Sequence, residues 1–309
     1  MRLKLGRPAL GDYADHFDDP AATADSPITV TWAGVTTLLV DDGDSALMTD
    51  GFFSRPTLAA VGTRRISPSP PRVDGCLARL GVTALDAVMP VHTHFDHAMD
   101  SAFVAERTGA KVVGGTSAAH IGRGHGLPDD RVVVATSGEP ITLGAKANWE
   151  VTLIEGHHCP PDRFPGTITA PVVPPVRTSA YKCGEAWSTV IRHVPTDRRM
   201  LVVGSAGYVA GALQGQHADV VYLGVGQLGL QPERYLVDYW TETVRTVRAR
   251  RVVLIHWDDF FRPLHQPLRA LPYVADDLDV SMRVLLRLAR DDGVALHLPT
   301  LWRRADPWS

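Results

Sequence analysis

Six consecutive residues near the end of the first third of the chain have the side-chain types and spacing of a metal site. Imidazole and carboxylate groups are the usual protein ligands of hydrolytic zinc. Solvated turns favour Gly, Asn, Asp and Ser over repeated histidines, so a metal site is preferred to a polar turn. The residues are His92, Thr93, His94, Phe95, Asp96 and His97.

The segment that precedes this motif must position it. The apolar run at residues 85–91 predicts a strand. Side chains alternate along a strand, so a strand that ends here directs His92 and His94 to the same side. Asp96 and His97 then fall in the turn and the first residues of a following helix. One short loop can therefore supply ligands to two metal ions.

The motif H-x-H-x-D-H resembles that of the metallo-β-lactamase superfamily. Residues 28–40 and 45–49, followed by Asp50, are similar to the first hairpin of the branch that contains N-acylphosphatidylethanolamine phospholipase D and L-ascorbate 6-phosphate lactonase. In that branch, the aspartate that corresponds to Asp50 lies beneath the metals. Matching elements continue to about residue 298. The resemblance implies an α/β fold, a four-layer αβ/βα sandwich.

The resemblance also implies the ligands of a first metal ion, namely His92, His94 and a third histidine at position 157 or 158. Gly156-His157 matches one family pattern, and His158-Cys159-Pro160 matches another. Adjacent residues of a strand face opposite ways, so only one of the two histidines is expected to be a ligand. We favour His158 and assign His157 to a supporting or core position.

The second metal ion would, by the same resemblance, be bound by Asp96, His97 and His256. His256 ends an apolar segment, where a lone histidine could equally be a satisfied buried residue. The motif at residues 92–97 and the polar run 257–259 favour a ligand. Asp96 is also the expected catalytic residue, which orients the attacking water or accepts its proton.

One position departs from the family pattern. Relatives usually have Gly-Asp after the strand at 200–204, and that aspartate bridges the two metals, whereas this chain has Gly204-Ser205. A neutral hydroxyl is a poorer ligand for a hard cation than a carboxylate. We therefore expect a weakly bound second ion, a mononuclear resting state, or a bridge made by water or hydroxide. Asp219 is a weak substitute candidate.

The composition is that of a soluble globular protein. The 309 residues are 45% hydrophobic and 21% charged, with a net charge of −3. This balance argues against nucleic-acid binding as the main function. No apolar stretch is long enough to span a bilayer. Residues 1–8 lack a secretory pattern, and three widely spaced cysteines fit a reducing compartment, so we expect a cytoplasmic protein.

The chain is expected to form one domain at residues 28–309 behind an N-terminal arm at residues 1–27. Six prolines in the segment 159–182 exclude helix interiors and central strands. A long irregular segment beside a site is often a lid, and the alternative is a rigid surface loop. The residues expected to contact a substrate there are Arg163, Arg177 and Tyr181.

Periodicity predicts the remaining elements. Strands and helices that alternate in this way indicate α/β layers. Residues 122–126 are expected to form a flexible loop, and residues 224–229 a strand-to-helix turn near the metals. The other predicted strands are 111–113, 149–154, 187–194, 200–204, 219–224, 251–256 and 293–298, and the predicted helices are 73–80, 97–108, 232–249 and 276–290.

These features predict a metal-dependent hydrolase that uses metal-activated water on an ester, lactone or phosphodiester. The expected cofactor is zinc, as one or two ions, with iron or manganese as alternatives. The expected partner is a small-molecule substrate. Two other hypotheses are a mononuclear iron redox enzyme of the same fold and a degenerate metal-binding protein without turnover. No feature of the sequence identifies the substrate or the oligomeric state.

Overall fold

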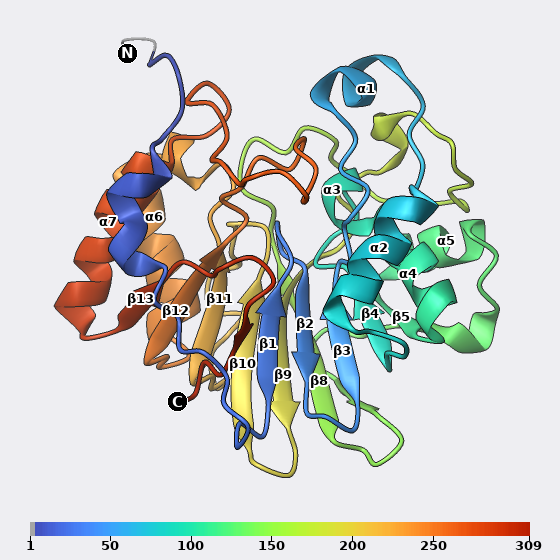
Figure 1. Ribbon diagram of the computed structural model, residues 1–309, viewed down its shortest axis with the longest axis horizontal. Helices are drawn as coiled ribbons and strands as arrows, with labels where there is room; N and C mark the ends of the chain where they lie inside the picture. Colours follow the sequence, from blue (N-terminus) through green and yellow to red (C-terminus); the bar gives the residue numbers. More distant parts are fainter. Residues whose placement is uncertain (1–3) are drawn as a thin grey trace.

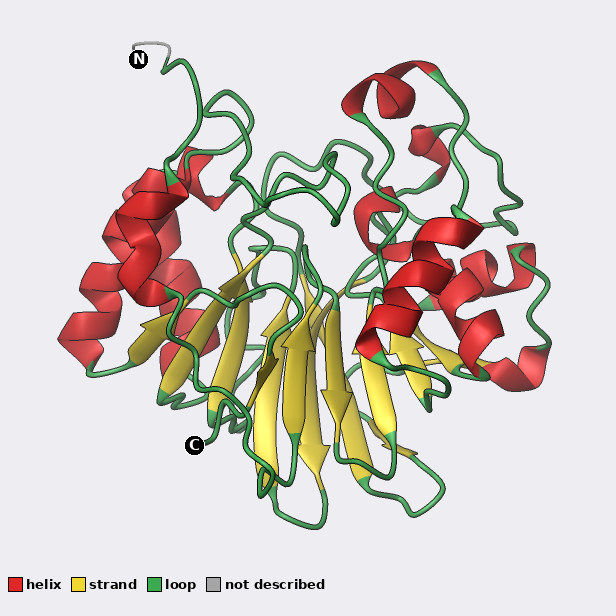
Figure 2. Ribbon diagram, in the orientation of Figure 1, coloured by secondary structure: helices red, strands yellow, loops and turns green. Residues whose placement is uncertain are grey.

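The computed structural model describes residues 4–309, in which two seven-stranded sheets pack face to face between outer layers of helices (Figures 1 and 2). Helices α6 and α7 lie on one side, and α2, α4 and α5 lie on the other. Apolar side chains of both sheets, such as Val40 and Leu201, share one buried cluster. The predicted four-layer α/β sandwich is confirmed.

The first sheet has the strand order β14-β1-β2-β3-β4-β5-β6, antiparallel from β14 to β3 and parallel from β3 to β6. Its β2–β3 hairpin turns at Asp42-Gly43, as the Asp-Gly pair predicts. The strands are β1 (Thr29–Trp32), β2 (Leu38–Asp41), β3 (Ala46–Thr49), β4 (Ala87–Met89), β5 (Lys111–Gly114), β6 (Val132–Val134) and β14 (Arg304–Ala305).

The prediction of one continuous strand over 28–40 was wrong. Residues 33–37 form a tight turn between β1 and β2, closed by the Thr37 amide, which donates to the Gly34 carbonyl at 2.9 Å. Gly34 has a φ of +90°, and an added Cβ there would lie 2.0 Å from Arg55 Nη2. The turn therefore depends on a glycine that the alternating pattern did not single out.

The second sheet has the order β13-β12-β11-β10-β9-β8-β7, antiparallel from β7 to β10 and parallel from β10 to β13. The parallel strands β10 to β12 are continuous apolar runs, as strands covered on both faces require. The strands are β7 (Pro140–Leu143), β8 (Trp149–Gly156), β9 (Ala186–His193), β10 (Arg198–Val203), β11 (Val220–Gly224), β12 (Arg251–Ile255) and β13 (Ala295–His297).

Two of the helices that the apolar periodicity predicts are interrupted or change type, whereas α2 begins three residues earlier than predicted. The helix expected over 97–108 is two helices, and the one expected over 232–249 continues as a π-helical segment, Thr241–Arg245. Residues 122–124, expected as loop, end α5, where Gly124 lies against the Val172 backbone. The α-helices are α1 (Leu58–Thr63), α2 (Pro70–Leu80), α3 (Phe95–Ala98), α4 (Ser101–Thr108), α5 (Thr116–Gly124), α6 (Glu233–Trp240) and α7 (Leu278–Asp292), with 3-10 turns at Leu10–His16, Asp129–Arg131, Thr178–Ala180 and Leu228–Leu230.

The N-terminal residues are bound to the second half of the chain by polar contacts. Lys4 Nζ lies 2.8 Å from Asp279 Oδ2, and Arg7 Nη1 lies 3.0 Å from Asp259 Oδ2. Residues 1–3 of the predicted arm lie outside the described residues. Between residues 4 and 309, no helix combines the length and apolar character needed to cross a membrane.

The carboxyl ends of five strands meet at the edge of the sandwich that is uppermost in Figure 1. Strands β3 and β4 run parallel in one sheet, and β8, β10 and β12 share one direction in the other. Every residue of the predicted metal site follows one of these strand ends. The fold thereby gathers positions from Asp50 to His256 at one edge.

Candidate metal centre

Three histidines from two loops meet at this edge and are called here the three-histidine cluster. His92 and His94 follow β4, and His158 follows β8. One nitrogen of each lies within 4.8 Å of one nitrogen of the others. His92 Nε2 and His94 Nδ1 are 3.0 Å apart. His157 is exposed and is not in the cluster, whereas His158 is partly buried.

At two of the three histidines, the nitrogen that faces away from the centre of the cluster has a hydrogen-bond partner of its own. His158 Nδ1 is 2.7 Å from the Cys159 carbonyl oxygen, and His92 Nδ1 is 2.8 Å from the Ser205 hydroxyl. His94 Nε2 is 3.1 Å from Asp162 Oδ1, in a geometry too bent for a hydrogen bond. Such partners set the tautomer and orientation of a ligating imidazole.

Asp96, His97 and His256 form a second group, called here the aspartate cluster. One ligand atom of each lies within 4.8 Å of those of the others, and all three residues are buried. His97 Nε2 and His256 Nε2 are 3.2 Å apart, and Asp96 Oδ2 is 3.7 Å from each. His256 directly follows β12 and therefore reaches this cluster from the second sheet.

Asp50 supports the aspartate cluster from below. Its Oδ2 accepts from His97 Nδ1 at 2.7 Å, and the Thr36 hydroxyl contacts both groups. Its Oδ1 accepts from the Val91 amide at 2.9 Å, which ties the end of β3 to the end of β4. A carboxylate behind a histidine raises the basicity of the nitrogen that faces the metal. Thr36 carried no recognisable sequence signal.

A buried ion pair holds the loop that carries His256. Arg55 Nη2 lies 2.7 Å from Asp258 Oδ2, and both side chains are fully buried. Asp258 Oδ1 accepts from the Val35 amide at 2.8 Å, and the Val35 carbonyl accepts from the His256 amide at 2.9 Å. His256 has a φ of +61°, which is unusual outside glycine. These contacts fix a strained backbone at a proposed ligand.

Burial keeps most of the imidazoles neutral. It lowers the pKa of His92 well below its usual value, and it lowers the pKa of His158 and of His256 to about 4. Neighbouring histidines act in the same direction. Metals bind the neutral imidazole, so these three groups are available as ligands at neutral pH.

Charged neighbours dominate at the other two members of the aspartate cluster. Burial would lower the pKa of His97, but the carboxylates of Asp50 and Asp96 outweigh it and raise that pKa. Burial would raise the pKa of Asp96, but the surrounding histidines hold it below its usual value. Asp96 is therefore ionised at neutral pH.

The donor atoms of both clusters fit first-row metal ions. Three imidazoles make a zinc-type set that leaves a fourth position open, and two imidazoles with one carboxylate suit zinc or iron. Ring nitrogens only 3.0 and 3.2 Å apart, one such pair in each cluster, are spaced as ligands around a shared cation would be.

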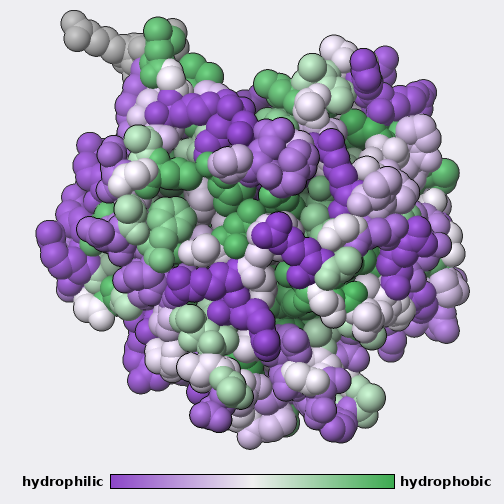
Figure 3. Space-filling model, viewed as in Figure 1, coloured by the Kyte–Doolittle hydropathy of each residue, from purple (hydrophilic) through white to green (hydrophobic). Residues whose placement is uncertain are grey.

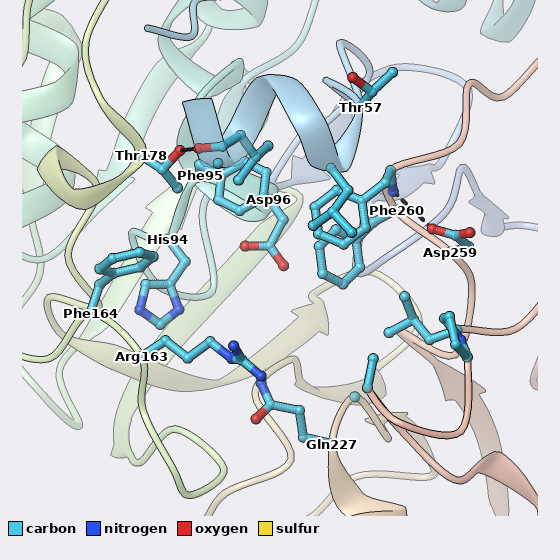
Figure 4. A pocket seen from close by; sticks show the side chains of 18 of the residues that line it. Thr57, His94, Phe95, Asp96, Arg163, Phe164, Thr178, Gln227, Asp259 and Phe260 are labelled. Carbon is cyan, nitrogen blue, oxygen red and sulfur yellow. Dashed lines mark hydrogen bonds between the residues drawn. The ribbon is translucent and has the colours of Figure 1, made fainter. Parts of the chain in front are cut away.

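Two residues of each cluster line a cavity of about 910 Å³, namely His94 and His158 of the one and Asp96 and His256 of the other. In the space-filling view, the upper edge of the molecule is indented between its two halves (Figure 3). The Asp96 carboxylate points into the cavity, with Arg163 and Gln227 opposite it and Phe260 at the side (Figure 4). Ser205 also lines it.

Of the three residues expected to contact a substrate, the structure places two at the cavity and one in the core. Arg163 and Arg177 line the cavity. Tyr181 does not, because it is fully buried in the core beneath α2 and α4, so we do not retain it as a substrate contact. Sequence reasoning did not identify the other lining residues from outside the segment 159–182, among them Arg7, Arg64, Phe260, Phe261 and Arg269.

Comparison with known proteins gives one similar curated sequence. No family model matches the chain. A protein of Myxococcus xanthus described as a UPF0173 metal-dependent hydrolase is 31% identical over 134 residues. The match covers 43% of this chain and 40% of the relative, so the chain aligns with less than half of that protein.

Solved structures share the architecture over most of the chain. The metallo-β-lactamase fold protein YhfI from Bacillus subtilis has a TM-score of 0.50 at 15% identity, over 91% of this chain and 99% of that one. The diiron β-hydroxylase CmlA from Streptomyces venezuelae has a TM-score of 0.54 at 14% identity, over 92% of this chain and 54% of CmlA. The branch suggested by the sequence stays a prediction. By its architecture, the chain has the metallo-β-lactamase fold.

Proposed function

We propose that the protein is a metal-dependent hydrolase that acts on an ester, lactone or phosphodiester bond of a small molecule. The observation that carries this proposal is that residues of two metal-ligand clusters line one open cavity. A purely structural metal site would be closed to solvent, whereas a catalytic one keeps an open position. The Myxococcus xanthus relative, described as a metal-dependent hydrolase, supports the same reaction class.

The ligands we propose are His92, His94 and His158 for one ion and Asp96, His97 and His256 for the other. Zinc is the proposed metal, with iron or manganese as alternatives. When bound, such an ion lowers the pKa of a water molecule and polarises a substrate oxygen. Ser205 brings no bridging carboxylate, which supports a weaker second ion or a mononuclear resting state.

The side chains around the clusters have separate proposed tasks. Asp96 is ionised and faces the cavity, so its carboxylate orients the nucleophilic water and accepts its proton. Gln227 lies opposite Asp96 and can donate to a developing oxyanion. Phe95, Phe260 and Phe261 pack together beside the clusters and keep bulk water from that side.

A mononuclear iron redox enzyme is the second candidate function. The aspartate cluster offers two imidazoles and one carboxylate, a set that also suits non-haem iron. CmlA, described as a diiron β-hydroxylase, shares the fold. A metal-binding protein without turnover is the third candidate, and the open cavity above the clusters argues against it.

The test measures metal content and hydrolysis together. Natively expressed protein is analysed by plasma emission and assayed against p-nitrophenyl esters, lactones and bis-p-nitrophenyl phosphate, with zinc or iron supplied. We expect His94→Ala to lose at least one metal equivalent and hydrolysis together, because His94 is a proposed ligand. The matched control is His125→Ala, which removes a histidine that pairs with Glu106 away from the clusters.

Unchanged metal content in His94→Ala would refute the ligand assignment. Substrate-dependent oxygen consumption by the iron form, without hydrolysis of the panel, would favour the redox candidate. Full metal loading of wild type without either activity would favour the third candidate.

A further inference from the structure

We propose that the substrate is an amphipathic anion whose carboxylate or phosphate group is held by Arg163, with Arg177 as a second positive charge on the cavity wall. That this anion is hydrolysed rests on the proposed function, whereas its binding in the cavity does not. The charged side chains that line the cavity are five arginines and two aspartates, although the whole chain has a net charge of −3. The lining residues concerned are Arg7, Arg64, Arg163, Arg177, Arg269, Asp96 and Asp259.

Both aspartates already have partners. Asp259 Oδ2 lies 3.0 Å from Arg7 Nη1 and 2.9 Å from Arg269 Nη2, so one carboxylate faces two guanidinium groups. Asp96 belongs to the aspartate cluster. The positive charge of the cavity is therefore not neutralised by its own acidic residues.

Three of the arginines have no carboxylate partner within residues 4–309. They are Arg64 near α1 and, on the Pro-rich segment, Arg163 and Arg177. Arg163 extends across the cavity and ends beside Gln227, opposite the Asp96 carboxylate (Figure 4). A guanidinium in that position can hold an oxyanion while the rest of the substrate lies over the clusters. The planar fork of arginine matches carboxylate and phosphate oxygens.

Apolar side chains make up much of the remaining wall. Phe260 and Phe261 have ring centroids 4.4 Å apart on one side, and Phe164 lies on the side of His94. Leu58 and Val274 line the cavity as well, yet each is 63% exposed. Covering such side chains with an alkyl or aryl group removes apolar surface from water. The cavity thus suits a molecule with one anionic and one apolar part.

Isothermal titration calorimetry of the protein as isolated tests the proposal with three probes of equal chain length. They are n-octyl phosphate, octanoate and the neutral 1-octanol. We expect at least one anion to bind about tenfold or more tightly than octanol, because each charge-assisted contact to arginine contributes to affinity. The relative strength of phosphate and carboxylate identifies which oxyanion the site prefers.

The double variant Arg163→Gln/Arg177→Gln is expected to lose that preference. It should bind the anion about tenfold or more weakly than wild type, and its affinity for octanol should be unchanged. The metal content of each sample is measured and proteins are compared at equal content, because an anion could also bind directly to the metal. The matched control is Arg283→Gln, an exposed arginine on α7. Equal binding of anions and octanol, or an unchanged anion affinity in the double variant, overturns the proposal.

Binding is measured without turnover, so the two proposals can fail separately. Arginine-dependent anion binding by a protein without hydrolytic activity would retain this inference and reject the hydrolase. Hydrolysis of neutral substrates without arginine-dependent anion binding would retain the hydrolase and reject this inference.

Discussion

The two ligand clusters lie side by side but are supported in different ways. Behind the three-histidine cluster are a hydroxyl at His92 and a backbone carbonyl at His158, both neutral partners. Behind the aspartate cluster is the buried carboxylate of Asp50, and the loop of His256 is fixed by the fully buried pair of Arg55 and Asp258.

The two clusters therefore differ in their charge and in how firmly their ligands are held in place. The three-histidine cluster has no carboxylate among its ligands, although Asp162 Oδ1 lies 3.1 Å from His94 Nε2, and its third ligand comes from the start of an irregular segment. The aspartate cluster concentrates negative charge, and a strained backbone at His256 is held by several interlocking contacts. We therefore expect damage to the first cluster to act mainly on metal affinity, and damage near the second to act on both metal affinity and folding stability.

The largest expected effect is at His158. His158→Ala should cost more metal affinity than the roughly 10–100-fold that follows loss of a supporting partner, because it removes a ligand of the three-histidine cluster. Its neighbour provides the matched control, since His157 is exposed and outside the cluster. Zinc titration of both variants decides the matter, and the reverse pattern would make His157 the ligand.

The next effect concerns the Arg55–Asp258 pair. Arg55→Met leaves the Asp258 carboxylate buried without its partner, which should lower the free energy of unfolding by about 3–5 kcal/mol in urea. The double variant Arg55→Met/Asp258→Leu should recover part of that loss. Arg107→Met breaks an exposed pair with Asp74 and should cost no more than about 1 kcal/mol. Equal losses in the two single variants would show that burial of the pair is unimportant.

A third prediction concerns the turn beside His256. Burial raises the pKa of Asp276 to about 7, although the amides of Gln227 and Gly229 donate to it. The folded pKa exceeds the unfolded one, so this group favours the folded state below about pH 4, and that contribution is lost as pH rises towards 7. The loss amounts to at most about 4 kcal/mol.

Asp276→Asn keeps an oxygen acceptor for the Gly229 amide and removes the titration. Urea unfolding from pH 4 to pH 7.5 should show the variant gaining stability relative to wild type as pH rises. Parallel curves for the two proteins would contradict the assignment.

The smallest expected effect is at Ser205. Ser205→Ala removes the hydroxyl beside His92 Nδ1 and should weaken zinc binding about tenfold. Ser205→Asp supplies a carboxylate at the position where the family resemblance implies a bridging aspartate, and should tighten binding of the second ion about 10–100-fold. Tight binding of two ions by wild type, unimproved by aspartate, would assign the bridge to water or to another residue.

Sequence reasoning went furthest where chemistry and periodicity agreed. An apolar strand was predicted directly before His92 and another directly before His256. In the structure, the ends of these two distant strands lie at one edge of the sandwich. Sequence reasoning failed where long-range packing decides local structure. The turn at Gly34 depends on Arg55, twenty-one residues later, and no alternating pattern encodes that contact.

The cavity wall shows the same limit. Arg163 and Arg177 could be proposed because they lie in the Pro-rich segment that follows His158. Arg7 and Arg269 could not, because their place depends on Asp259, which brings the chain's N-terminal residues to the site. Tyr181 shares the segment with Arg177 but faces the core, since an irregular segment has no period from which direction can be read.

The order of the ligands along the chain has a consequence for synthesis. The three-histidine cluster has its last ligand at residue 158, whereas the aspartate cluster needs His256, about 98 residues later. At the roughly 5–20 residues per second of translation, several seconds pass between the two. Nascent chains thus expose the three histidines of the first cluster, and any cation they capture, before His256, the last ligand of the second cluster, has left the ribosome.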